Sequence, residues 1–231
     1  MPTGCPSKSP GAFFGRRKGH ALRPRQAALF ESLLPQLALD LSRPAPADLR
    51  TLFDGVDRVR LESGFGGGEH LIAEAARAAD IGFIGIEPFV NGMAKTLAAI
   101  DDRKLRNIRL HHGDATELLA WLPDNGLAQV DLLYPDPWPK RRHWKRRFVQ
   151  DSSVAAIARI LCSGGAFRFA TDIPDYAAWT LMRLLRSPHF EWIAEEADDW
   201  RKPWADFTRT RYEAKALREG RVPAYFIFRR K

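Results

Sequence analysis

The segment Tyr134-Pro-Asp-Pro-Trp-Pro-Lys140 places one acidic residue, Asp136, inside a turn that is rich in proline. Each proline fixes its own φ and restricts the residue before it, so the carboxylate can point in only a few directions. The preceding residues 131–134 are typical of the end of a buried strand, and open α/β sheets place their chemistry at the carboxyl ends of the strands. We therefore expect this turn to lie at a functional site.

A strongly basic segment follows the turn directly. Six of the eight residues 140–147 are Lys or Arg, and the whole chain carries a net charge of +8. Such a run favours a polyanionic substrate, and the interleaved Trp138 and Trp144 favour nucleic acid. The alternative is a solvated turn followed by a charged helix face, which is the commonest reason for a charge run.

Length and composition favour one domain of an ordinary globular protein. The chain has 231 residues, 45% of them hydrophobic, and it contains no apolar run long enough to span a bilayer. It also lacks the apolar region of a secretory signal. Cys5 and Cys162 are too few for a disulfide framework and do not lie at the spacing of metal ligands. We expect a cytoplasmic protein with no metal and no membrane contact, either a monomer or a homodimer.

Two parts of the chain differ in composition. Residues 1–25 are basic, contain no acid and predict a flexible N-terminal arm, whereas residues 26–231 predict a single domain. Residues 26–39 have helical spacing, and strands then alternate with helices, which predicts a mostly parallel sheet covered on both faces. The expected strands are 59–61, 82–86, 107–111, 129–134 and 166–170, with further candidates at 190–193 and 224–228. The expected helices are 69–79, 90–101, 116–122, 149–161 and 176–185, with Gly164 and Gly165 near the end of the fourth.

A glycine-rich loop follows the first of these strands. Gly64, Gly66 and Gly68 allow a tight turn and a close approach of the backbone to a ligand. A dinucleotide site would need a further glycine at position 69, where this chain has Glu69, whose carboxylate would repel a pyrophosphate. The loop, together with Glu62 on the strand, is better suited to a ligand without phosphates. S-adenosylmethionine is such a ligand, and a nicotinamide-dependent oxidoreductase is disfavoured.

Two further acidic residues follow successive strands. Glu87 ends the second strand, in the position of the acid that holds ribose hydroxyls in doubly wound folds. Asp114 follows the third strand, where it could accept a hydrogen bond from an adenine amino group. Either residue alone could instead cap the next helix. A glycine loop and three acids at successive strand ends together indicate a cofactor site.

The motifs resemble those of the bacterial tRNA (guanine-N7-)-methyltransferases. The resemblance is carried by Glu62-Ser-Gly-Phe-Gly-Gly-Gly-Glu69, by Pro135-Asp-Pro-Trp-Pro-Lys140 with the basic residues 145–147, by Thr171-Asp172 and by Thr210-Arg-Tyr-Glu213. It runs from about Phe14 to Phe228. It implies a Rossmann-like class I methyltransferase fold with a mostly parallel seven-stranded sheet, S-adenosylmethionine as methyl donor, and tRNA as partner. The implied reaction is methylation of N7 of a guanine in the tRNA variable loop.

The resemblance also implies residue roles. The cofactor positions are Glu62, Gly64, Gly66, Glu87, Asp114 and Asp136. The catalytic position is Asp136. The substrate positions are Lys140, Asp172, Thr210 and Glu213. The RNA contacts are Arg142, His143, Trp144, Lys145, Arg146 and Arg147. Ser63 and Gly67 depart from the side chains usual in the family, but no mapped functional residue is lost.

Two other readings remain open from the sequence. The first is a methyltransferase for exocyclic amines, whose Asp/Asn-Pro-Pro-aromatic motif partly resembles the segment at Asp136. The chain has Trp138 where that motif has its second proline. The second is a non-catalytic RNA-binding module, which would leave the acids at the strand ends without a role.

Overall fold

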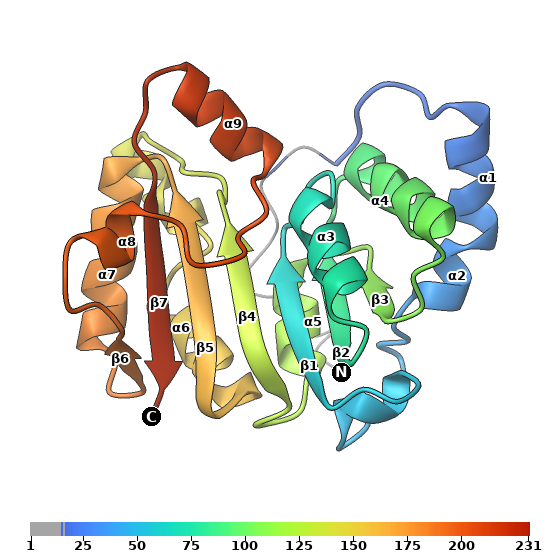
Figure 1. Cartoon of the computed structure of the whole chain (residues 1–231), viewed down its shortest axis with the longest axis horizontal. Coiled ribbons are helices and arrows are strands. Elements are labelled where there is room, and N and C mark those ends of the chain that lie inside the picture. Colours follow the sequence, from blue (N-terminus) through green and yellow to red (C-terminus); the bar gives the residue numbers. More distant parts are fainter. Residues whose placement is uncertain (1–14, 16) are drawn as a thin grey trace, which may run out of the picture.

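The computed structural model describes residue 15 and residues 17–231. Within them, seven strands form one sheet in the order β3-β2-β1-β4-β5-β7-β6 (Figure 1). The strands are β1 (Arg58–Ser63), β2 (Ile81–Ile86), β3 (Ile108–His111), β4 (Leu127–Leu133), β5 (Leu161–Thr171), β6 (Phe190–Trp192) and β7 (Ala224–Arg230). The first five strands in this order run parallel, whereas β7 is antiparallel to β5 and β6 is antiparallel to β7. The predicted mostly parallel seven-stranded sheet is confirmed.

Helices cover both faces of the sheet (Figure 1). One face carries α3 (Glu69–Arg77) and α4 (Val90–Arg103), and the other carries α5 (Ala115–Trp121), α6 (Asp151–Ile160) and α7 (Pro174–Arg186). The short α8 (Asp198–Arg201) and α9 (Arg211–Arg218) lie between β6 and β7 in the sequence. The chain moves outward from β1 to one side and from β4 to the other, so these central strands form the topological switch point, where such sheets bind ligands.

Gly164 and Gly165 were predicted to lie near the end of a helix, and this prediction is wrong. Helix α6 stops at Ile160 and β5 begins at the next residue, so both glycines lie within the strand. The register against β4 shifts at this point, between Leu127 and Gln129, and Gly164 has φ +77°. The glycines therefore allow an irregularity at the start of β5. Helix ends and strand bulges both use glycine because both require a positive φ.

The helix predicted over residues 26–39 is divided into α1 (Pro24–Ser32) and α2 (Leu34–Leu37). Pro35 has no N–H group, and its ring would collide with the carbonyl of an uninterrupted preceding turn. The break at Leu33 relieves that conflict, and Pro35 then occupies the first turn of α2, where proline is tolerated.

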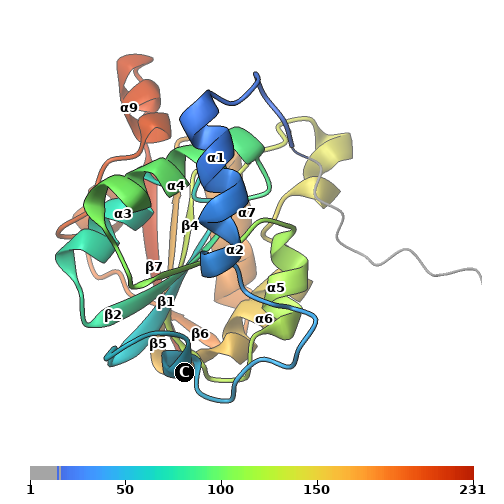
Figure 2. The same cartoon turned by 90° about the vertical axis from the view of Figure 1, so that its right-hand side faces the viewer.

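The segment before α1 is bonded to the start of α4 (Figure 2). The Val90 N–H donates to the Arg17 carbonyl at 2.9 Å. The Gly19 N–H donates to Asn91 Oδ1, and Asn91 Nδ2 donates to the His20 carbonyl, each at 2.8 Å. The folded part therefore includes residues 17–25, which were predicted to belong to the flexible arm. Residues 1–14 and 16 of that arm lie outside the described residues.

The larger core cluster lies between the sheet and the helices α5, α6 and α7. Phe169 of β5 is fully buried there, with its ring centroid 6.0 Å from that of Phe226 and 5.5 Å from that of Tyr176. These aromatic contacts join the parallel part of the sheet to β7 and to α7.

We expect Phe169→Ala to lower the free energy of unfolding by about 3–5 kcal/mol, because it removes buried apolar surface and leaves a cavity. Urea unfolding followed by circular dichroism measures the change. Leu185→Ala is the matched control: Leu185 is 57% exposed on α7, and its loss should change stability by less than about 0.5 kcal/mol. Similar losses in both variants would contradict this account of the core.

Candidate functional site

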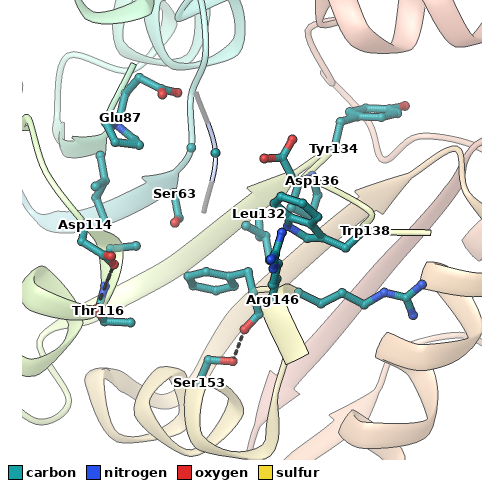
Figure 3. Close-up of a pocket in the computed structure, with 18 of the residues that line it drawn as sticks. Ser63, Glu87, Asp114, Thr116, Leu132, Tyr134, Asp136, Trp138, Arg146 and Ser153 are labelled. Atoms are coloured by element: carbon teal, nitrogen blue, oxygen red, sulfur yellow. Dashed lines mark hydrogen bonds between the residues drawn. The ribbon is translucent and has the colours of Figure 1, made fainter. Parts of the chain in front are cut away.

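A cavity of about 640 Å³ opens at the carboxyl ends of β1, β2 and β4. Its volume lies within the range of small-molecule sites. Five of the predicted cofactor residues line it: Gly64, Gly66, Glu87, Asp114 and Asp136. Figure 3 shows Glu87 and Asp114 on one side of the cavity and Asp136 with Trp138 on the other. Strand ends distant in the sequence therefore meet at one site, as expected.

The glycine loop has the conformation that its sequence predicts. Gly64, Gly66 and Gly68 have φ of +72°, +57° and +77°, a region that side chains rarely adopt. A Cβ atom on Gly68 would also lie 2.3 Å from Thr96 Oγ1 of α4.

Gly92 is a residue of this region that the sequence reasoning missed. A Cβ atom there would lie 2.2 Å from the Gly66 carbonyl oxygen, so its absence lets α4 pack directly on the loop. The sequence feature that could have revealed it is the position of a glycine in the first turn of a helix, because glycine normally weakens a helix.

Glu87 links the loop to the end of β2. Its Oε2 accepts a hydrogen bond from the Gly66 N–H at 2.6 Å, and its Oε1 accepts one from the Phe89 N–H at 2.9 Å. Burial raises the pKa of this carboxyl to about 7, although both backbone hydrogen bonds oppose the shift. Two carboxylate oxygens offer about four acceptor positions, so Glu87 keeps capacity for a ligand hydroxyl.

Asp114 caps a helix, which was the alternative role considered for it, and it also lines the cavity. It is the N-cap of α5, where its Oδ1 accepts bonds from the Thr116 N–H at 2.9 Å and from the Thr116 hydroxyl at 2.8 Å (Figure 3). The cap fixes the direction of the carboxylate at the cavity wall.

Glu62 does not line the cavity. It is buried against α3, and its Oε2 lies 2.8 Å from His70 Nδ1. Burial alone would lower the pKa of His70, but the charge and hydrogen bond of Glu62 outweigh it and raise the pKa to about 9. The two residues thus form a buried pair that joins β1 to α3, although burial raises the pKa of Glu62 as well. The cofactor contact expected of Glu62 stays a prediction.

Asp136 occupies a turn whose backbone is strained on both sides. Tyr134 and Trp138, neither of them glycine, have φ of +50° and +42°. Such conformations cost on the order of 1–3 kcal/mol each and persist only where surrounding contacts impose them. Burial raises the pKa of Asp136, which is half-exposed at the cavity mouth beside Tyr134 (Figure 3).

The basic run forms a 3-10 helix, η2 (Arg141–Arg146), with two different faces. Its outer side chains are exposed to solvent: Lys140, Arg141, Arg142 and Lys145. The inner ones pack on aromatic rings: the Arg146 guanidinium lies 5.0 Å from the centre of the Trp138 ring, and the rings of Trp138 and His143 meet edge to face at 5.7 Å. Trp144 packs on Trp179 of α7.

Arg147 differs from the other basic residues of the run. Its side chain is completely buried and forms an ion pair with Asp175. The structure therefore lends no support to the RNA contact predicted for Arg147, because solvent does not reach its guanidinium. A basic residue cannot be placed inside or outside from a charge count alone.

The predicted substrate residues Asp172, Thr210 and Glu213 lie outside the cavity lining. Asp172 forms an ion pair with Arg221. Thr210 caps α9 by accepting the Glu213 N–H at 3.1 Å, and the buried Glu213 accepts a hydrogen bond from the Tyr225 hydroxyl.

The two residues between Thr210 and Glu213, which the sequence reasoning passed over, do line the cavity. These are Arg211 and Tyr212. The helix cap holds Thr210 and Glu213 buried in the protein, and the two residues between them face the cavity. Their signal was a position inside the motif Thr210-Arg-Tyr-Glu213.

Comparisons with known proteins assign the family. The model of a family described as "Putative methyltransferase" matches residues 57–225. A tRNA (guanine-N(7)-)-methyltransferase of Rhodopseudomonas palustris (strain BisB5) is 64% identical over 221 residues, which cover 95% of this chain and 86% of the relative. Its namesake of Bradyrhizobium diazoefficiens is 62% identical over 95% of this chain and 93% of the relative. This chain belongs to the tRNA (guanine-N7-)-methyltransferase family.

Solved structures agree with this assignment at the level of the fold. The 16S rRNA methyltransferase KamB aligns with a TM-score of 0.54 and 14% identity over 82% of this chain and 95% of that chain. The precorrin-6y C5,15-methyltransferase of Geobacter metallireducens GS-15 aligns with a TM-score of 0.51 and 16% identity, over 89% of this chain and 88% of that one. The fold is that of the class I methyltransferases. Family membership makes this protein an enzyme and overturns the oxidoreductase and the non-catalytic module.

Among residue 15 and residues 17–231 of this methyltransferase, no three His, Cys, Asp or Glu side chains are grouped as a metal ion would need. Within the same residues, none of the helices has the length and apolar character required to cross a membrane.

The His70–Glu62 pair generates a pH prediction for this methyltransferase. The pKa of His70 is about 9 in the folded protein, above its ordinary value of about 6.5. The pair's contribution to stability is therefore complete below pH 6.5 and decreases as the pH rises towards 9, by at most about 1.4 kcal/mol per pH unit. Urea unfolding at pH 6, 7.5 and 9 measures the decrease, and His70→Gln should abolish it. His189→Gln, at an exposed position, is the control. Identical pH dependence in wild type and His70→Gln would disprove the ion pair.

Proposed function

We propose that this enzyme transfers the methyl group of S-adenosylmethionine to N7 of a guanine in the variable loop of tRNA. The observation that carries the proposal is the meeting, in one cavity, of a glycine loop suited to a ligand without phosphates and the Asp136 turn. A tRNA substrate implies the bacterial cytoplasm. Whether the enzyme is a monomer or a homodimer stays a prediction.

The residues of the cavity fit this cofactor. Glu87 keeps free acceptor positions for the ribose hydroxyls, and Asp114 stands on the same side of the cavity, where it would accept a hydrogen bond from the adenine amino group (Figure 3). The loop offers backbone at Gly64 and Gly66 without side chains. When bound, S-adenosylmethionine supplies an electrophilic methyl group on a sulfonium.

Guanine N7 carries a lone pair and no proton at neutral pH, so its methylation needs no general base. The task of the protein is to hold N7 in line with the methyl carbon and to exclude water, and such positioning can supply about 7–11 kcal/mol. Asp136 would act as a hydrogen-bond acceptor and a fixed charge, and Trp138 beside it offers a ring on which a base can stack.

Guanine carries two adjacent donors, its N1–H and its amino group, and adenine does not carry this pair. Selection of guanine therefore requires acceptors for both donors. Asp172 and Glu213 are the proposed acceptors, with Thr210 and the exposed Lys140 as further substrate contacts. Both carboxylates already have partners: Arg221 pairs with Asp172, the Tyr225 hydroxyl bonds to Glu213, and Arg209 Nε lies 3.5 Å from Glu213 Oε2, which is buried and has no hydrogen bond. An unsatisfied buried acceptor is costly, and a substrate donor would relieve it.

The exocyclic-amine reading makes a different prediction for Asp136. If N7 attack needs positioning alone, Asp136→Asn should keep more activity than Asp136→Ala, because Asn retains a hydrogen-bonding oxygen. Removing it should cost about 1–3 kcal/mol for each donor left unpaired. Single-turnover rates on a tRNA transcript with labelled S-adenosylmethionine, followed by mass mapping of the methylated nucleoside, provide the test. Equal loss in both variants, with the label on an exocyclic nitrogen, would refute the N7 reading.

Cofactor affinity should depend on the charge of Glu87. The ribose hydroxyls donate to the ionised carboxylate, whose pKa of about 7 in the free enzyme means that affinity should increase as the pH rises from 6 to 8. Glu87→Gln should lower affinity by about 1.5–3 kcal/mol and flatten this dependence. Calorimetry measures both. Glu69→Gln in the same region, where Glu69 pairs with Lys95 outside the cavity lining, is the control. Unchanged affinity in Glu87→Gln would exclude the ribose contact.

A further inference from the structure

Arg147 occupies a buried site enclosed by aromatic rings, in which Nε and Nη2 have partners and Nη1 has no hydrogen bond. Its Cζ lies 4.9 Å from the centre of the Trp144 ring and 5.0 Å from the ring centres of both Tyr176 and Trp179. Asp175 of α7 supplies the opposite charge. Cation–π contacts strengthen when they are shielded from water, so three rings and a carboxylate offset the cost of burying this charge.

The same guanidinium is bonded to the Asp136 turn. Arg147 Nε donates to the Pro137 carbonyl at 2.9 Å, and Pro137 follows Asp136 directly. The bond reaches the turn between its two strained residues, Tyr134 and Trp138. Since a strained backbone requires external contacts to persist, the Arg147 bond is one of the contacts that impose this conformation.

A contact between Arg147 and a tRNA phosphate would conflict with this arrangement. The side chain is completely buried, and a phosphate could reach it only if the rings separated or the Asp175 pair broke. By contrast, Arg142 and Lys145 of η2 are exposed and need no rearrangement. The basic run therefore has an outer part suited to phosphates and an inner residue suited to holding the protein together.

We propose that Arg147 is a positioning residue: it fixes the direction of the Asp136 carboxylate by holding the Pro137 carbonyl and does not bind RNA. The proposal rests on the proposed function, because it assumes that Asp136 acts at the reacting guanine. It separates Arg147 from the other residues of 142–147, all of which were expected to contact RNA.

Arg147→Met tests the proposal, because Met fills similar space between the rings but cannot bond to Pro137. We expect kcat to fall by up to about 100-fold, the effect of a small misplacement at a reaction centre. KM for tRNA and the salt dependence of tRNA binding should stay as in wild type. Lys145→Ala is the matched control. It should flatten the slope of log K against log salt by roughly 0.7–0.9, a change that Arg147→Met should not produce.

Arg147→Lys distinguishes charge from geometry. Lys keeps the positive charge for a phosphate or for Asp175 but lacks the planar fork that bonds Pro137 and Asp175 together. A positioning role predicts that Lys loses kcat as Met does, whereas a phosphate contact predicts that Lys restores tRNA affinity. Restored affinity together with wild-type kcat would overturn the proposal.

Asp175→Asn provides a variant that leaves all three rings and the Pro137 bond in place. The Asp175 side chain is 54% exposed, so the substitution removes the counterion without opening the core. The positioning role predicts a kcat close to that of wild type, because the bond to Pro137 remains, and no gain in tRNA affinity. Tighter tRNA binding would mean that Asp175 had competed with phosphate for Arg147, and this would count against the proposal.

Hydrogen exchange of the unliganded protein separates the failure of this proposal from the failure of the proposed function. Within residues 134–139, the amides of Tyr134, Asp136 and Trp138, the residues that are not proline, should exchange faster in Arg147→Met than in wild type or Lys145→Ala, whatever reaction the enzyme catalyses. Unchanged exchange would overturn the positioning role even if the wild type methylates guanine N7. Faster exchange with a wild type that methylates another atom would overturn the proposed function alone.

Discussion

The withdrawal of charged groups from water is the constraint on which the rest of this site depends. Glu87, Glu62 and Arg147 are each almost completely buried, and a buried ion is tolerated only where partners replace its hydration. Glu87 has two backbone N–H groups, Glu62 has His70, and Arg147 has Asp175 and three rings. Apart from Phe89 and Trp144, each of these partners belongs to another segment, so compensating the charges also fixes the glycine loop, α3 and the Asp136 turn relative to one another.

The fold supplies these partners because the sheet changes direction between β1 and β4. The glycine loop follows β1, Glu87 follows β2 and Asp136 follows β4, so three connections meet above adjacent strands. The C-terminal part then adds α9, whose residues Arg211 and Tyr212 approach the loop from the far side of the sheet order (Figure 1). Residues from both halves of the chain thus line one cavity.

The parts of this arrangement that follow from local chemistry could be predicted from the sequence. Alternating strands and helices specified the sheet, and the positive φ values of the loop required Gly64, Gly66 and Gly68. The break at Leu33 and the strand position of Gly164 depend on competition between neighbouring elements, which hydrophobic spacing does not report. The inward orientation of Arg147 depends on rings at positions 176 and 179, which the chain brings near only after folding.

This last case shows why a charge run is ambiguous as evidence for RNA binding. Successive residues of η2 and its end point in different directions, so a run of six cations presents some to solvent and others to the protein. Aromatic residues add to the ambiguity: Trp144, which suggested stacking on bases, packs against Arg147 and Trp179, and Arg146 lies over the same Trp138 ring that is proposed to stack on a base. Because the same planar guanidinium suits a phosphate and an aromatic ring, composition cannot separate the two uses. The geometry of the turn can, since only the inner arginine bonds to the backbone that carries Asp136.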